Sequence, residues 1–345
     1  MLLTIALLTK NSEDTVRFAL RSIFRQKIPD NVTYELIVID GYSRDSTLNI
    51  VTEEVQKLRE KFSNQYIRRI ILQERVGVGF ARNLALKEAQ GDWILWIDSD
   101  NILACNYILK AIEEIEKVKY GNVAVLYPQR AIPVPRKRNL ASKLITCYNT
   151  ILAYQSNSKF FVTQKRILSE QLKGSKERVL PYTGMQGTFC STEALRKVGG
   201  FNPYLIAAED VDLLLKLTNN DYNMKSFNST LYYFTRDSFR TWFRQAMTWE
   251  YGKIIMHIFN NAAEFEKVSP VMKPMWLQKI ANRVISSITM SINALCLCDS
   301  FIALLIPLIY TYRRLGYFTG YLHALNQQEA ISKLFQTNVL RYKRA

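Results

Sequence analysis

Four short apolar segments alternate with amphipathic segments over the first hundred residues, and this alternation limits the possible folds more than any other feature. The apolar segments, at 2–8, 34–40, 67–74 and 92–98, have the length of buried strands, and the segments between them, at 15–26, 48–62 and 80–89, have helical spacing. Strands that alternate with helices of this length form parallel sheets with helices on both faces. We therefore predict an α/β domain built on such a sheet.

The pattern beyond residue 100 is less regular. A strand is predicted within 121–138, and it ends in a loop with three prolines and a basic cluster. Segment 139–172 has an amphipathic helical pattern, 180–205 holds one short strand and one helix, and 207–217 is a helix opened by carboxylates. From 237 to 330 the chain is predicted to be helical and increasingly apolar.

The apolar run "WILWIDSDN" ends on two aspartates, Asp98 and Asp100. In an extended chain these two side chains lie on the same side, and two anions that close favour a cation between them. A divalent ion that takes oxygen ligands is the usual choice. A solvated turn after the strand explains the same residues, because aspartate is a common turn former. The stretch alone leaves both interpretations open.

Polar residues follow each of the four predicted strands. They are Thr9 and Asn11, Asp40 and Ser43, Glu74 and Arg75, and Asp98 and Asp100. Because parallel strands place their carboxyl ends at one edge, and ligands of such sheets bind beyond that edge, we predict one binding site there.

Composition excludes several classes of protein. The chain of 345 residues is 48% hydrophobic and 22% charged, which is typical of a globular protein. Two histidines and five cysteines without framework spacing argue against a structural zinc site and a Ser-His-Asp triad, and they indicate a reducing compartment. The net charge is +16, and from Leu231 onward 14 Lys and Arg stand against 6 Asp and Glu. With no nucleic-acid motif present, an anionic membrane surface is the expected partner, not a nucleic acid.

Three further motifs have both a structural and a functional interpretation. "GVGFARN" places Arg82 where a dinucleotide fingerprint needs glycine, so hydride transfer is not predicted; Arg82 either clamps phosphate oxygens or lies on a helix surface. Glu209 and Asp210 cap a helix or supply a general base. Trp242, Arg244 and Gln245 belong to a packed amphipathic helix or to a binding surface for a leaving diphosphate.

In sequence, these motifs resemble the family 2 glycosyltransferases, which have the GT-A fold. The chain carries a "TKN" strand end, "VIDGYSRDST", "GVGFARN", "DSD", "GGFNPYLIAAEDVDL" and an Arg-Trp-Arg-Gln helix, in that order. The resemblance covers roughly residues 1 to 255. It implies a Rossmann-like nucleotide-binding mixed sheet and an inverting transfer from a nucleotide-diphosphate sugar.

The resemblance also implies roles for individual residues. In the donor site, Thr9, Glu13 and Asp40 would hold the nucleoside, Arg82 would lie near the ribose or phosphates, and Asp98 would lie by the ribose. Asp100, with Asp98, would bind Mn²⁺ or Mg²⁺. Asp210 would be the base, ahead of Glu209, and Trp242, Arg244 and Gln245 would cover the diphosphate. Leu8 and Lys10 around Thr9 depart from the family pattern, as do Met185 and Gln186 in "TGMQGT", which leaves the base and the acceptor open. We expect UDP in preference to GDP.

The expected domains are a GT-A catalytic domain at 1–235 and a helical, membrane-associated region at 236–345. The first divides into a nucleotide-sugar half, about 1–105, and an acceptor half, about 106–235. Segment 284–310 has a single charge, Asp299, and either spans a membrane, lies in its interface or forms a helical subdomain. The resemblance places the protein at the cytoplasmic face of the cell membrane.

We therefore expect a metal-assisted glycosyltransferase that acts on a hydroxyl of a lipid-linked saccharide or polysaccharide precursor. A polyprenyl-phosphate sugar synthase, of the dolichyl-phosphate kind, is the alternative. A nucleotide-sugar-binding protein without turnover is more remote, because Asp98, Asp100 and Asp210 are all present.

Overall fold

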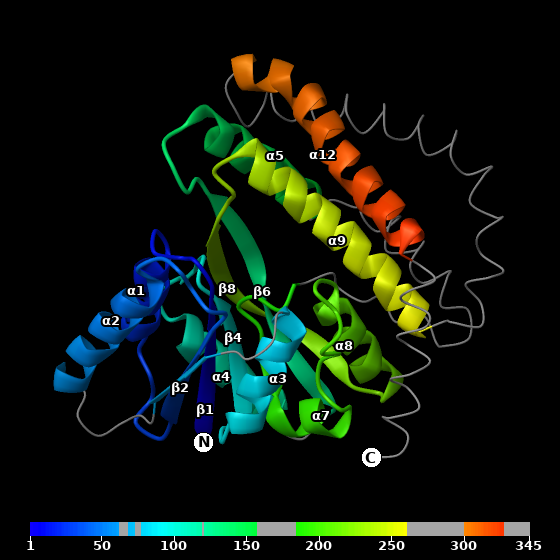
Figure 1. Cartoon of the computed structure of the whole chain (residues 1–345). Helices are drawn as coiled ribbons and strands as arrows, with labels where there is room; N and C mark the ends of the chain where they lie inside the picture. Colours follow the sequence, from blue (N-terminus) through cyan, green and yellow to red (C-terminus); the bar gives the residue numbers. More distant parts are fainter. Residues whose placement is uncertain (62–67, 73–76, 119–120, 157–183, 261–299, 328–345) are drawn as a thin grey trace. The chain divides into compact units, whose positions relative to one another are not determined.

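The computed structural model describes residues 1–61, 68–72, 77–118, 121–156, 184–260 and 300–327. The chain divides into two compact units (Figure 1). Unit 1 contains Met1–Val134, Gln155–Tyr204 and Glu209–Thr235, and unit 2 contains Pro135–Tyr154, Leu205–Ala208 and Arg236–Ala345. The expected functional domains, 1–235 and 236–345, stay a prediction.

Unit 1 is built on an eight-stranded sheet in the order β3-β2-β1-β4-β7-β6-β8-β5. The strands are β1 (Leu2–Thr9), β2 (Thr33–Asp40), β3 (Arg68–Leu72), β4 (Trp93–Asp98), β5 (Asn101–Leu103), β6 (Val123–Val134), β7 (Phe189–Ser191) and β8 (Asn223–Phe234). The first four strands are parallel, whereas β7 is antiparallel to β4 and β6, and β5 is antiparallel to β8. The sheet is therefore mixed. The predicted purely parallel arrangement is found in its four neighbouring strands β3, β2, β1 and β4.

The register of the parallel strands aligns their carboxyl ends. Thr9 of β1 pairs with Asp40 of β2, and its neighbour Leu8 pairs with Asp98 of β4. Side chains alternate between the two faces along each strand, so β1 sends Leu3, Ile5 and Leu7 into one apolar core and Ala6 into the other. The predicted convergence of strand ends at one edge is confirmed for these three strands.

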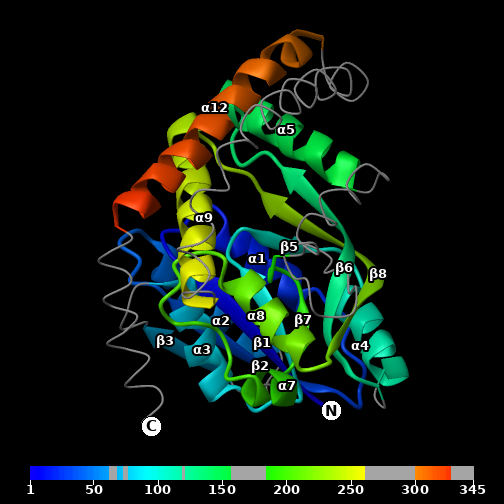
Figure 2. The same cartoon turned by 90° about the vertical axis from the view of Figure 1, so that its right-hand side faces the viewer.

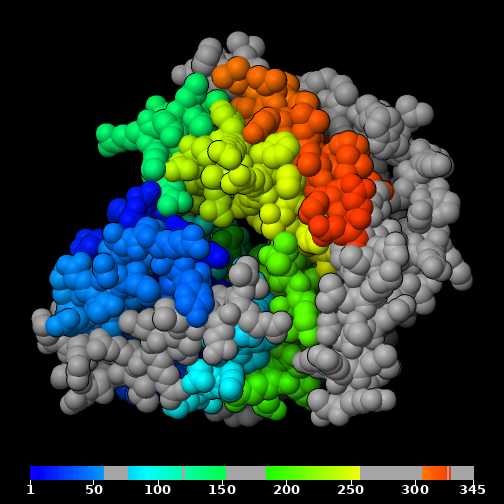
Figure 3. Space-filling model, viewed as in Figure 1, coloured from blue at the N-terminus to red at the C-terminus, as the bar shows by residue number. Residues whose placement is uncertain are grey.

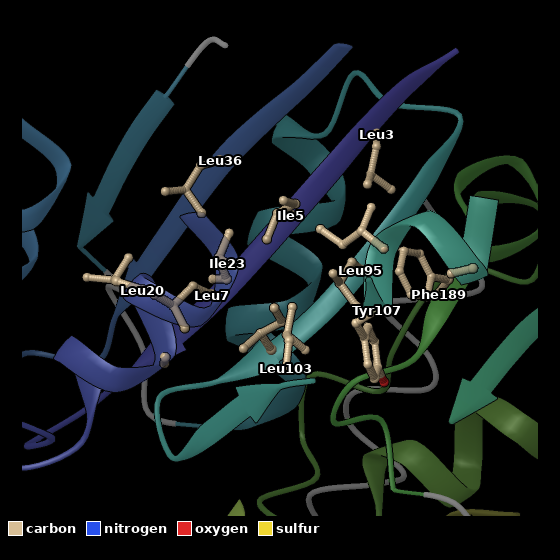
Figure 4. Close-up of a cluster of buried hydrophobic side chains, with 14 of the residues drawn as sticks. Leu3, Ile5, Leu7, Leu20, Ile23, Leu36, Leu95, Leu103, Tyr107 and Phe189 are labelled. Atoms are coloured by element: carbon tan, nitrogen blue, oxygen red, sulfur yellow. The ribbon is translucent and has the colours of Figure 1, made fainter. Parts of the chain in front are cut away.

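Helices cover both faces of the sheet. On the face shown in Figure 4, Leu20 and Ile23 of α1 (Val16–Phe24) and Tyr107 of α4 (Tyr107–Val118) pack with Leu3 and Ile5. This face also holds α2 (Thr47–Lys61), while the other face holds α3 (Val78–Glu88), α7 (Thr192–Lys197) and α8 (Glu209–Asn219). The two cores fix the sheet from both sides, which makes its edge a rigid support for a site.

Three elements were not predicted, and one was longer than predicted. β5, α4 and β8 lie in stretches to which the sequence analysis assigned no element. The predicted loop at the end of β6 is strand as far as Val134, so Pro128 and Pro133 lie within a strand. Proline donates no ladder hydrogen bond, and the pairing of β6 with β8 shifts register between Pro128 and Arg130.

Unit 2 contains α9 (Phe239–Asn260), α12 (Ser300–Asn326) and all but the last two residues of α5 (Leu140–Ser156). Its core joins Tyr148 of α5, Trp242 of α9, and Ile306 and Ile309 of α12. The last two helices run side by side in both views (Figures 1 and 2). A Cβ on Gly316 would lie 2.9 Å from the carbonyl oxygen of Phe243, so glycine allows the two backbones to approach closely.

Two expectations concern this unit. No helix in the described part of the chain combines the length and the hydrophobicity needed to cross a bilayer, and residues 284–299 of the predicted apolar segment lie outside that part.

Cys147 of α5 is disulfide-bonded, which the cysteine spacing did not predict and which a reducing compartment does not favour.

Candidate active site

The carboxyl ends of β1 and β2 meet at Asp40. The buried carboxylate accepts hydrogen bonds from Thr9 Oγ1 at 2.8 Å, from Ser43 N at 2.8 Å and from Ser43 Oγ at 2.7 Å. Both of its oxygens therefore have protein partners, and Asp40 ties together the loops that follow the two strands.

These two loops are joined by further polar contacts. Glu13 is exposed and accepts a hydrogen bond from Ser46 N at 3.0 Å, while its own N–H donates to Asp45 Oδ2 at 3.2 Å. Tyr42 has a φ of 58° and is 56% exposed directly after the Asp40 strand end. An exposed aromatic ring offers a stacking surface for a nucleobase, and the sequence analysis did not single it out.

The "DSD" stretch forms a strand end and a turn. β4 stops at Asp98, and Ser99 and Asp100 lie in the turn, so the extended geometry assumed for this motif ends at Asp98. Asn101 organises the turn: its Oδ1 accepts from Asp98 N at 3.0 Å, and its Nδ2 donates to Asp100 Oδ1 at 3.1 Å. Ser99 Oγ donates to Ser12 Oγ at 2.6 Å, which anchors the turn to the β1 loop.

Residues distant in sequence complete this turn. Asn101 Nδ2 also lies 3.3 Å from Gln186 Oε1, and Phe234 N donates to the Asp100 carbonyl at 2.8 Å. Burial raises the pKa of Tyr233 to about 12, and the charge of Asp100 adds to this shift. Tyr233 was missed by the sequence analysis because only the pairing of β5 with β8 brings it to the motif, whereas Asn101 directly follows Asp100 in the sequence.

Arg82 of α3 is buried between carboxylates from two other elements. Its Nη1 donates to Glu209 Oε1 at 2.5 Å, and its Nη2 lies 3.7 Å from Asp98 Oδ1. Gly79 allows the backbone of α3 to lie close to Asn202, since a Cβ on this glycine would lie 2.5 Å from the Asn202 carbonyl oxygen. Arg82 therefore does not lie on a helix surface; it connects the β4 end with the first turn of α8.

The charges around Arg82 are unbalanced. Burial by itself lowers the pKa of the guanidinium, but Glu209, Asp98 and Asp210 outweigh it and raise that pKa above its usual value. Burial raises the pKa of the Glu209 carboxyl to about 7 against the lowering effect of Arg82, and the charge of Asp210 adds to the rise. One cation shared by three carboxylates leaves excess negative charge at the strand ends, which favours a further cation.

Asp210 is presented at the start of α8. Ala208 precedes the acidic pair with a φ of 64°, a left-handed conformation that is unfavourable for a residue with a Cβ. Asp210 Oδ1 accepts from Val211 N at 2.8 Å, and Oδ2 faces Gly184, whose added Cβ would lie 3.6 Å away. Asp210 is partly exposed whereas Glu209 is buried, so Asp210 is the more accessible of the two.

The chemistry of the donor set fits a hard divalent ion. Asp98 and Asp100 offer carboxylate oxygens beside the excess negative charge around Arg82. Within the described ranges no group of three or more His, Cys, Asp or Glu side chains is placed to hold one ion. An ion that takes one or two carboxylates and completes its shell with substrate phosphate oxygens and water suits such a site, as Mg²⁺ does in phosphate chemistry.

The predicted diphosphate residues of α9 belong to unit 2. Trp242 is buried, its ring meets Tyr148 edge-on at 5.0 Å between centroids, and its carbonyl accepts a hydrogen bond from Arg313. Gln245 Oε1 lies 3.4 Å from Arg313 Nη2, and Arg244 is exposed. Their roles toward a diphosphate stay a prediction, as do those of Glu74 and Arg75, which lie outside the described residues.

Because the charges around Arg82 are unbalanced, we expect replacement of Arg82 and replacement of Glu209 to lower the free energy of unfolding by different amounts. Arg82→Gln is expected to lower the free energy of unfolding by about 3–5 kcal/mol, because it leaves three carboxylates without a cation. Glu209→Gln is expected to cost clearly less, because Asp98 and Asp210 still neutralise Arg82. Urea unfolding at neutral pH measures both, and equal costs would contradict this account.

The pH dependence of the same variants is a second readout. Because the pKa of Glu209 rises from 4.5 to about 7 on folding, the folded protein binds a proton in that window that the unfolded chain releases. The contribution of Glu209 to stability is therefore complete below about pH 4.5 and is lost as the pH rises through about 7. Glu209→Gln should flatten this decline, while an unchanged slope would place the titration on another group.

Sequence models of two related families match the chain. The family described as glycosyl transferase family 2 matches residues 4–174, and glycosyl transferase family group 2 matches residues 93–322, two thirds of the chain. Together the matches include both the strand-end motifs and the α8 carboxylates.

Curated relatives match over shorter segments. Poly(ribitol-phosphate) beta-N-acetylglucosaminyltransferase TarS of Staphylococcus aureus is 36% identical over 95 residues, which cover 28% of this chain and 15% of the relative. A poly(ribitol-phosphate) beta-glucosyltransferase of Bacillus spizizenii is 32% identical over 114 residues, which cover 32% of this chain and 16% of the relative. The matched part of the chain thus spans less than a fifth of either relative.

A solved structure supports the fold over nearly the whole chain. The mannosyltransferase PcManGT of Pyrobaculum calidifontis aligns with 94% of this chain and 86% of its own, with a TM-score of 0.54 and 16% sequence identity. At that identity the likeness concerns the fold alone, and it agrees with the mixed, helix-flanked sheet of unit 1.

Proposed function

We propose a function from one premise: the chain belongs to the family 2 glycosyltransferases and has their GT-A fold. We propose that it moves a sugar, with inversion, from a nucleotide-diphosphate sugar to a hydroxyl of a lipid-linked saccharide or polysaccharide precursor. The observation that carries this proposal is the cluster of Arg82, Asp98, Glu209 and Asp210 at the strand ends. It combines an acceptor-activating carboxylate with a charge arrangement suited to a diphosphate and its cation.

Asp210 is the proposed general base. The acceptor hydroxyl must lose its proton as its oxygen attacks the sugar, and a positioned carboxylate takes that proton. Asp210 is accessible and its Oδ2 faces Gly184, where the lack of a side chain leaves room. Glu209 is buried against Arg82, so it positions the guanidinium and the start of α8.

Asp100 and Asp98 are the proposed ligands of a Mn²⁺ or Mg²⁺ ion. When bound, such an ion neutralises charge that develops on the leaving nucleoside diphosphate. Asn101 accepts a hydrogen bond from the Asp98 N–H and donates one to the Asp100 carboxylate, so the conformation of this turn is fixed by the protein itself. The mannosyltransferase of Pyrobaculum calidifontis was solved with GDP-mannose and Mn²⁺, and we propose equivalent chemistry here.

The nucleoside is proposed to bind over the joined loops of β1 and β2. Thr9, Glu13 and Asp40 supply polar groups, and Tyr42 supplies an exposed ring for the base. Asp40 already accepts three hydrogen bonds from the protein, so its main effect is to hold these loops in place. UDP in preference to GDP stays a prediction.

The acceptor proposal rests on the relatives. TarS carries poly(ribitol-phosphate) in its name, and a relative of Escherichia coli acts on a sugar linked to diphosphoundecaprenol. One name contains a polymer and the other a lipid-linked sugar, and we propose an acceptor of this kind for this chain. The expected location at a membrane surface fits such an acceptor, and the side of the membrane stays a prediction.

The test is ligand-induced stabilisation of the purified chain. UDP, GDP and their sugars are added with and without Mn²⁺, and thermal unfolding is recorded. A ligand present at a hundred times its Kd stabilises by about 2.7 kcal/mol, so one nucleotide should produce a clear, metal-dependent shift. Release of nucleoside diphosphate then separates turnover from binding alone. The absence of any shift from a folded sample would contradict the proposal.

A further inference from the structure

The helix α12 has two faces of different character. The face toward α9 carries buried residues at helical spacing, among them Ile309, Arg313, Gly316 and Gly320. Gly316 and Gly320 lie against the α9 backbone at Phe243 and Met247, where any side chain would collide. This contact fixes which side of α12 is turned away from α9.

The opposite face of α12 is exposed and apolar. Leu308 is 68% exposed, Leu315 54%, Phe318 49% and Leu322 44%. Their spacing of seven, three and four residues places them along one stripe of a helix, on average about 130° around the helix axis from Gly316 and Gly320. We call these four residues the α12 stripe. In Figure 3, α12 lies at the surface beside α9, in orange-red and yellow.

The charge of the chain is concentrated in the unit that carries the stripe. Unit 2 has 18 Lys and Arg against 6 Asp and Glu, whereas the whole chain has 46 against 30. Unit 2 therefore accounts for +12 of the net charge of +16. Residues 300–326 of α12 contain no Asp or Glu, and the exposed basic residues of the unit include Arg138 and Lys143 at the start of α5.

We propose that unit 2 docks on an anionic lipid surface, with α12 lying in the plane of the interface and the α12 stripe entering the boundary between headgroups and acyl chains. An amphipathic helix binds in this way through buried apolar area, while basic residues around it attract anionic headgroups. The arrangement needs no spanning segment.

A lipid surface suits the stripe better than a second copy of the chain. Two copies of unit 2 would bring two charges of +12 together, whereas an anionic surface neutralises that charge. The four side chains expose roughly 400 Å², about half of the 800 Å² that each partner of a stable protein complex usually buries. The apolar area is small, and its combination with basic charge is typical of peripheral membrane contact.

The test compares two phenylalanines of similar exposure. Phe318 of the stripe is 49% exposed and Phe18, in unit 1, is 53% exposed, so Phe318→Glu and Phe18→Glu make the same change in different places. Full-length protein is sedimented with vesicles of phosphatidylcholine, with or without phosphatidylglycerol. We expect binding only to the anionic vesicles, at least tenfold weaker for Phe318→Glu, near wild type for Phe18→Glu, and weaker at high salt.

Several outcomes would overturn the docking proposal. One is that the wild-type protein binds neither kind of vesicle. Another is that the two variants lose vesicle binding to the same extent. A dimer that Phe318→Glu dissociates would assign the stripe to a second copy. A large loss of thermal stability in Phe318→Glu would mean that the chain itself covers the stripe. Nucleotide-induced stabilisation of Phe318→Glu should match wild type, so a failure of docking is distinguishable from a failure of the proposed function.

Discussion

Asp210→Asn is expected to reduce the rate of sugar transfer by about 10²–10⁴-fold, the usual contribution of a positioned general base. Asparagine keeps the size of the side chain and its oxygen can still accept the hydrogen bond from Val211 N, so the start of α8 is retained. It cannot accept a proton from the acceptor. The measurement is kcat with a saturating donor, with nucleotide-induced stabilisation as a check that donor binding is intact.

Glu209→Gln is the matched control for this experiment. It removes a neighbouring carboxylate that is buried against Arg82, and its effect on kcat should be at least tenfold smaller than that of Asp210→Asn. A larger loss in Glu209→Gln would reverse the two roles. Nearly full activity in Asp210→Asn would instead favour a lipid phosphate as the acceptor, because a phosphate oxygen needs no strong base.

Asp100→Asn is expected to abolish the metal-dependent part of nucleotide binding and to lower kcat/KM by about 10²–10³-fold, since charge on the leaving diphosphate is then poorly neutralised. The turn itself should survive, because the Phe234 N–H binds the Asp100 carbonyl and not its side chain. Thermal shifts with the preferred nucleotide, with and without Mn²⁺, measure the effect directly.

Ser99→Ala is the control for the Asp100 variant. Ser99 lies between the two aspartates but bonds to Ser12 at the β1 loop, away from the proposed cation. It should cost some stability and leave the metal dependence of nucleotide binding unchanged. An Asp100→Asn protein that still needs Mn²⁺ for nucleotide binding would assign the ion to other oxygens.

The strand-end half of the site could be predicted because local patterns determine it. Apolar runs of strand length end at Thr9, Asp40 and Asp98, and the parallel register aligns those ends. The family resemblance then supplied roles that the residues alone left open. The fold and the enzyme class were predictable in this way, and the residue roles remain to be tested by the variants above.

The rest of the site depends on contacts between residues far apart in sequence. Arg82 and Glu209 are 127 positions apart, and neither position alone distinguishes a buried ion pair from a surface arginine and a helix cap. Tyr233 meets the Asp100 turn through a strand that the sequence analysis did not assign. The α4 helix was a different omission, since its buried residues from Tyr107 to Ile115 do follow a helical pattern.

The division of the chain into two units has a consequence for how the protein can be shortened. The polypeptide passes between the units five times, at residues 134/135, 154/155, 204/205, 208/209 and 235/236. A protein cut after Thr235 would keep α5 but lose Trp242 and Ile306, so Tyr148 and the other apolar residues of α5 would lose their packing partners. The helices α9 and α12 are therefore not a removable appendage, since they complete a folding unit that also contains α5, about a hundred residues earlier in the chain.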